Sequence, residues 1–149
     1  MSTDTAFDRD RTVKTLNEIV ELELAGAVRY TQYSLMVFGH ARIPIMSWMR
    51  EQAAEALTHA AAAGEEVTSL GGSVSLGIAP LVGTHHNSVD EMMEEMLTHE
   101  RHGVALYTRL LELAEGRSIS IEELARSTIR AEELHIAEIG KMLRRRGDA

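Results

Sequence analysis

Four long segments of this chain carry apolar residues at steps of three and four positions, the spacing of one face of an amphipathic helix. The expected helices cover approximately residues 8–38, 44–72, 88–116 and 120–146. Ser88-Val89-Asp90-Glu91 and Ser120-Ile121-Glu122-Glu123 both fit the capping box, which predicts where the third and fourth helices begin. The sequence therefore predicts an all-α fold, a four-helix bundle, with residues 1–149 forming a single domain whose core is 8–146.

The connections between these helices are short, long and short. The long one spans positions 72–87 and carries the apolar side chains Val74, Leu76, Ile78, Leu81 and Val82. Extended, it reaches about 50 Å, which exceeds the ~42 Å length of a helix of ~28 residues. We therefore expect a long crossover that lies along the bundle and makes the second and third helices parallel.

Charge and cysteine content exclude several classes of protein. The chain has no cysteine, so disulfide scaffolds, thiol nucleophiles and iron–sulfur sites are excluded, and any metal must be held by oxygen and imidazole ligands. A formal net charge of −8 argues against nucleic acid as a partner. The N-terminal residues show no apolar signal region, and no stretch is apolar enough to span a membrane, so a cytoplasmic location is expected.

Acidic and histidine residues interrupt the apolar faces at one common depth. Glu23 and His59 are equally far along the chain from the turn near Ala41, one before it and the other after it. Glu100 and His135 flank the turn near Arg117 in the same way and at nearly the same separation, and Glu132 stands one helical turn before His135. In antiparallel helix pairs Glu23, His59, Glu100 and His135 would lie about 26–27 Å from their turns, with Glu132 one helical turn from that level. Without a nearby Lys or Arg on these faces, carboxylates and imidazoles that meet inside a bundle predict a metal site.

The second helix lacks a Glu-x-x-His pair, because Ala56 stands at the position where that pair would have its glutamate before His59. Glu55, one position earlier, shares the face of His59, and a local π-bulge could turn it inward. With Glu55 included, four carboxylates would balance two divalent ions. Oxygen and imidazole donors suit iron, manganese or zinc, and open coordination positions favour redox-active iron.

Other polar residues near these positions have simpler interpretations. Tyr30 and Tyr107 each follow a glutamate of the site, Glu23 and Glu100, by two helical turns, and are either core tyrosines or phenols that hydrogen-bond to the site. His99 and His102 are expected at the surface, although His102 could reach the residues around the ligands. The loop histidines at positions 85 and 86 are also expected to be exposed.

The motifs together resemble the bacterioferritin branch of the ferritin-like di-iron superfamily over nearly all of residues 8–146. The resemblance rests on the following residues: Leu16-Asn17, Glu23-Leu24 and Tyr30; His59-Ala60 and Leu70-Gly71-Gly72; Val89-Asp90-Glu91-Met92-Met93, Glu100 and Gly103; and Glu132-Glu133-Leu134-His135. It implies that Glu23 and Glu100 are terminal ligands, Glu132 a bridging ligand, and His59 and His135 the imidazole ligands. It also implies a ferroxidase, in which two Fe(II) ions are oxidised by O₂ or peroxide, with a role in iron storage or homeostasis.

Three departures from the family pattern narrow these expectations. The second bridging glutamate falls on Ala56, and the haem-ligating methionine falls on Leu57, so no haem is expected. The segment after His135 is too short for the fifth helix of cage-forming bacterioferritins. A homo-oligomer, at least a dimer, is expected, whereas a 24-subunit shell is not implied.

Two other functions remain open from the sequence. The first is a rubrerythrin-like enzyme that reduces peroxide or oxygen with the same ligands and an external electron donor. The second is a metal-free helical bundle that serves as a scaffold or dimer module.

Overall fold

The computed structural model describes residues 6–81 and 88–145, and these form four helices. The helices are α1 (Arg9–Met36), α2 (Arg42–Ser69), α3 (Val89–Ala114) and α4 (Ile119–Leu143). Each predicted helix is present, with ends that differ from the prediction by a few residues. The predicted end of the fourth helix at Arg146, and residues 82–87 of the long connection with its two histidines, lie outside the described residues.

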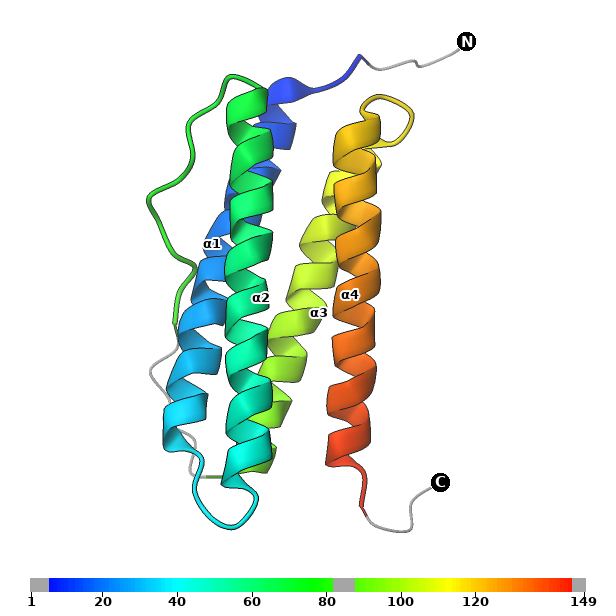
Figure 1. The fold of residues 1–149 in the computed structure, drawn as a ribbon. Helices are drawn as coiled ribbons and strands as arrows, with labels where there is room; N and C mark the ends of the chain where they lie inside the picture. Colours follow the sequence, from blue (N-terminus) through cyan, green and yellow to red (C-terminus); the bar gives the residue numbers. More distant parts are fainter. Residues whose placement is uncertain (1–5, 82–87, 146–149) are drawn as a thin grey trace.

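The helices form two antiparallel pairs that pack into one bundle (Figure 1). α1 packs against α2, α3 packs against α4, and smaller contacts join α1 to α3 and α2 to α4. α2 and α3 run in the same direction, so the chain must return along the bundle between them. The predicted crossover is therefore confirmed. Among the described residues, no helix combines the length and apolar content needed to cross a lipid bilayer.

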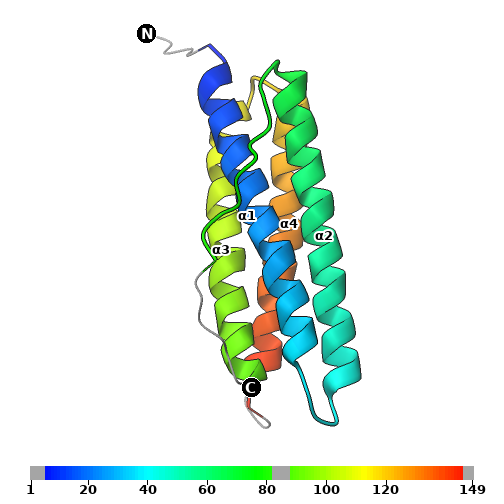
Figure 2. The same ribbon diagram turned by 90° about the vertical axis from the view of Figure 1, so that its left-hand side faces the viewer.

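The described part of the crossover follows α1 down the bundle (Figure 2). The Asn17 side chain donates to the Ser73 carbonyl at 3.0 Å and accepts from the Ser75 amide at 2.9 Å, and the Ala79 amide donates to the Glu21 carbonyl at 3.0 Å. Leu76 remains exposed to solvent, as do Val74, Ile78 and Leu81 in the described part of the segment. The crossover is thus attached by hydrogen bonds to α1 more than by the apolar burial that its sequence indicated.

The end of α2 and the start of α4 follow well-known capping geometry. The amides of Gly71 and Gly72 donate to the carbonyls of Thr68 and Val67, both at 2.9 Å, which is the Schellman motif, and Gly71 takes the left-handed φ of +77° that this motif requires. α4 begins before the predicted capping box. Ser118, not Ser120, accepts a hydrogen bond from the Ile121 amide, because Ser118 has the extended backbone of an N-cap.

The hydrophobic core is divided into two clusters that lie at opposite ends of the bundle. One cluster includes Leu16, Val67, Leu110 and Ile121; the other includes Tyr30, Met49, Met93, Met96 and Ile139. In every helix the residues of the two clusters flank the positions at which the sequence predicted ligands. The apolar core therefore encloses one polar level near the middle of the bundle.

Candidate metal centre

Five predicted ligands from all four helices meet at this polar level. Glu23, Glu100 and Glu132 are each only 5% exposed, and the His59 and His135 side chains are largely buried. The sequence places them there because each occupies an inward position of an otherwise apolar helix face. The structure thus brings together residues that their matching distances from the turns predicted to meet.

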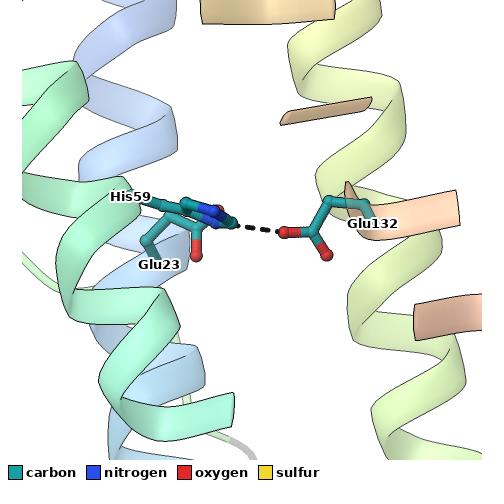
Figure 3. Close-up of side chains that lie close together, drawn as sticks. All are labelled: Glu23, His59 and Glu132. Atoms are coloured by element: carbon teal, nitrogen blue, oxygen red, sulfur yellow. Dashed lines mark ion pairs between the residues drawn. The ribbon is translucent and has the colours of Figure 1, made fainter. Parts of the chain in front are cut away.

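The first group of side chains comes from α1, α2 and α4. His59 Nδ1 lies 3.5 Å from Glu23 Oε1 and 3.3 Å from Glu132 Oε1. Figure 3 shows Glu23 and His59 side by side, with Glu132 facing them from across the bundle. One oxygen or nitrogen atom from each of the three lies within 4.8 Å of the others, close enough to hold one ion.

The second group comes from α3 and α4. His135 Nδ1 lies 4.0 Å from Glu100 Oε2 and 3.8 Å from Glu132 Oε2. These three residues also place one donor atom each within 4.8 Å. Both groups therefore have the same composition, one glutamate and one histidine together with Glu132.

Glu132 belongs to both groups, and its two oxygens serve them separately. Oε1 is the atom nearest His59, whereas Oε2 is the atom nearest His135. A carboxylate whose oxygens face two adjacent ligand groups can bridge two cations. The arrangement favours a dinuclear centre over two independent sites.

Two features of this geometry fit a bound cation. The Nδ1 atoms of His59 and His135 are buried, and neither has a hydrogen-bond partner among the described residues. The residues that line the central cavity include no Lys or Arg. Buried polar atoms without partners require an explanation, and carboxylate oxygens with imidazole nitrogens are the donors that iron, manganese and zinc accept.

The electrostatics of the site couple the two histidines to the carboxylates. Burial lowers the pKa of His59, but attraction by the Glu132 and Glu23 carboxylates outweighs it and raises the pKa to about 10. Glu132 likewise raises the pKa of His135. Burial raises the pKa of Glu23 and would do the same for Glu132, whose pKa is nevertheless lowered by His135 and His59. Without metal, protonation of the two histidines partly offsets the charge of the carboxylates, and a cation that binds a ring nitrogen would displace its proton.

Each of the two tyrosines hydrogen-bonds to the glutamate of the opposite helix. Tyr30 of α1 donates to Glu100 of α3, and Tyr107 of α3 donates to Glu23 of α1 at 3.0 Å. Burial raises the pKa of both phenols, so both remain neutral donors. The interpretation as phenols bound to the site therefore holds for both, and each fixes the orientation of one terminal carboxylate.

Glu55 occupies a different place from the other predicted ligands. Its side chain is partly exposed and lines the same central cavity, and its oxygens lie 3.6 Å from His59 Nε2 and 3.0 Å from His135 Nε2. It thus faces the outer nitrogens of the two rings, and it belongs to neither of the two ligand groups. Ala56, where the family pattern has a glutamate, is buried and lines the central cavity.

His99 is the residue near the site that the sequence placed wrongly at the surface. Its ring packs edge-on against Tyr30, with 6.3 Å between ring centroids, and lines the central cavity. Burial lowers its pKa to about 4, so it is neutral. The space for the ring comes from Gly26, where an added Cβ would lie 2.6 Å from His99 Nε2. The only sequence signal for this placement of His99 was a glycine within another helix that could face it. That pairing is visible only once α1 and α3 are aligned.

Comparisons with known proteins identify a family model and solved structures that are similar to this chain. A family model described as a ferritin-like domain matches residues 13–146. A ferritin-like, di-iron-carboxylate protein from Bacillus anthracis has 23% identity and a TM-score of 0.82, with 97% of this chain and 100% of that chain covered. A comparison with curated protein sequences gave no match.

Two further solved structures are similar. A dodecameric thioferritin, the bacterioferritin-related protein of Bacteroides fragilis, has 18% identity and a TM-score of 0.85, with 92% of this chain and 86% of that chain covered. The bacterioferritin of Desulfovibrio desulfuricans, described with a di-iron site, has 19% identity and a TM-score of 0.80, with 91% and 79% covered. At these identities the likeness shows the fold, which is the predicted ferritin-like four-helix bundle.

Proposed function

Because the chain belongs to the ferritin-like family, we propose that it binds two iron ions and oxidises Fe(II) with O₂ or peroxide, in iron storage or homeostasis. The observation that carries the proposal is the shared carboxylate Glu132, whose oxygens face two matching ligand groups. The bacterioferritin and di-iron-carboxylate relatives support iron over zinc or manganese.

The protein residues would hold and orient the ions and exclude water. Glu23 and His59 would bind one ion and Glu100 and His135 the other, with Glu132 between them. Tyr30 and Tyr107 would keep the terminal carboxylates directed inward. Bound iron would supply the one-electron chemistry that reduces O₂ or peroxide.

Aerobic oxidation of Fe(II), followed by ferric absorbance, tests this proposal. The wild-type protein should oxidise two Fe(II) per chain in a fast phase, and Glu132→Gln should lose that phase. Glu133→Gln is the matched control, because Glu133 is the exposed neighbour on the same helix. Equal rapid oxidation by wild-type protein and Glu132→Gln would refute the assignment.

The same experiment separates the two alternatives. A rubrerythrin-like enzyme would turn over repeatedly with peroxide when an external reductant is supplied, and would not accumulate ferric product. A metal-free scaffold would bind no iron and would oxidise Fe(II) no faster than buffer. A cytoplasmic location stays a prediction of the sequence.

We also propose that the chain forms a homo-oligomer. Val28 and Leu35 on α1 and Leu57 on α2 are exposed apolar residues, and Phe38 in the turn between these helices is 82% exposed. Trp48, in contrast, packs partly against the core. The dodecameric Bacteroides fragilis relative supports assembly. Light scattering on the purified protein that gave the mass of one chain would contradict it.

A further inference from the structure

Glu55 contacts two histidines from different helices on the side that faces away from the proposed ions. Its Oε1 lies 3.6 Å from Nε2 of His59 on its own helix, and its Oε2 lies 3.0 Å from Nε2 of His135 on α4. A single carboxylate therefore spans the outer nitrogens of both imidazoles. The inner nitrogens, both Nδ1, face the buried carboxylates and lack hydrogen-bond partners among the described residues.

An imidazole that binds a metal requires this arrangement, in which one ring nitrogen faces the ion site and the other faces a hydrogen-bond acceptor. A neutral histidine that binds a cation through Nδ1 carries its proton on Nε2 and can donate it. A carboxylate that accepts a hydrogen bond from this Nε2–H group fixes the ring orientation and increases the basicity of the ligand nitrogen. Glu55 has one oxygen available for each of the two rings.

The neighbouring residue explains why α2 has an outer carboxylate and no bridging one. Ala56 is buried against the central cavity, and its methyl group cannot bind a cation. Three inner carboxylates provide three negative charges, whereas two divalent ions bring four positive charges. Glu55, which also lines the cavity, provides the fourth negative charge without belonging to either ligand group.

We propose that Glu55 is a positioning residue, which accepts a hydrogen bond from Nε2 of His135, attracts Nε2 of His59 and so orients both rings, and that it is not itself a metal ligand. This inference rests on the proposed function, since it concerns the same dinuclear site. It predicts that the two metal ions share a single bridging carboxylate from the protein, that of Glu132.

Two readouts on purified protein test the role of Glu55. The first is a titration with Co(II), monitored by isothermal calorimetry and by visible absorption. Glu55→Ala and Glu55→Gln should still bind two ions with an unchanged ligand-field spectrum, but with affinity lower by roughly 10–100-fold. Glu51→Ala, an exposed residue one turn earlier on α2, is the matched control and should behave as wild type.

The second readout is proton–nitrogen NMR of ¹⁵N-histidine-labelled protein loaded with Zn(II). Wild-type protein should show a protected, downfield Nε2–H signal from His135. In Glu55→Ala this proton should exchange rapidly with solvent, whereas in Glu51→Ala its signal should persist. Glu55→Gln retains the side-chain shape, so it provides the comparison if the alanine variant folds poorly.

The outcomes distinguish this inference from the proposed function. Wild-type protein that binds no Co(II) would overturn the proposed function and, with it, the role of Glu55. Wild-type protein that binds two ions, together with Glu55 variants that lose one ion or change the ligand-field spectrum, would show that Glu55 is a ligand. A His135 Nε2–H signal that remains protected in Glu55→Ala would also overturn the inference.

Discussion

Replacing Glu132 should remove both metal ions, whereas replacing Glu23 should remove one. Glu132 Oε1 and Oε2 face His59 and His135, at 3.3 and 3.8 Å, so its carboxylate is part of each ligand group. Glu23 lies in the first group alone. Loss of an outer partner of a metal ligand costs 10–100-fold in affinity, so loss of a direct ligand should cost at least about 100-fold, or about 2.7 kcal/mol per ion.

The assay is calorimetric titration of the metal-free protein with Co(II), with the bound metal measured after dialysis. Wild-type protein should bind two ions, Glu23→Gln one, and Glu132→Gln none at concentrations that saturate the wild type. Circular dichroism before titration checks that each variant keeps its helices, since a Glu→Gln change preserves side-chain volume. If Glu132→Gln kept one ion at wild-type affinity, or if Glu23→Gln lost both ions, the shared-ligand reasoning would be wrong.

Four further predictions test the electrostatics, the site and the fold. His59 has its pKa raised from 6.5 to about 10 in the folded metal-free protein, so its stabilising effect should be complete below pH 6.5 and lost as pH rises through about 10. Urea unfolding across this range should show the loss, and His59→Gln should reduce it. Tyr30→Phe should lower the affinity for one of the two ions roughly tenfold, because Glu100 loses its hydrogen-bond donor. A Co(II) titration measures this affinity. Ser118→Ala should destabilise the protein by about 1 kcal/mol in urea unfolding, and Ser120→Ala by less than about 0.5 kcal/mol, because only Ser118 caps α4. Leu110→Ala, at a side chain with no exposed surface, should cost about 2–5 kcal/mol in the same assay.

The helices themselves were predictable because their signals are local. Apolar residues at steps of three and four, the serine before α3 and the glycines after α2 act within one or two turns of the chain. The exception is the start of α4, where Ser118 and Ser120 both suit an N-cap. Ser120 instead donates to Glu66 on α2, a contact between distant parts of the sequence that no local pattern reveals.

The residues of the candidate site were predictable for a similar reason. Glu23, Glu100 and Glu132 are charged residues on apolar faces, and matching separations from two turns set them at one level. Regular helix geometry converts such separations into heights. The tyrosine contacts could be expected only as one of two alternatives, since they depend on how α1 and α3 face one another.

The sequence by itself determined the donor atoms, their helices and their common depth, because helix periodicity and rise are properties of the backbone. Tertiary structure decided which donors lie close enough together to share an ion, that the two oxygens of Glu132 face different histidines, and that Glu55 contacts the outer nitrogens. It also decided that His99 is enclosed beside Gly26. These outcomes depend on the rotation and separation of neighbouring helices, which are set by side-chain packing between segments far apart in the chain.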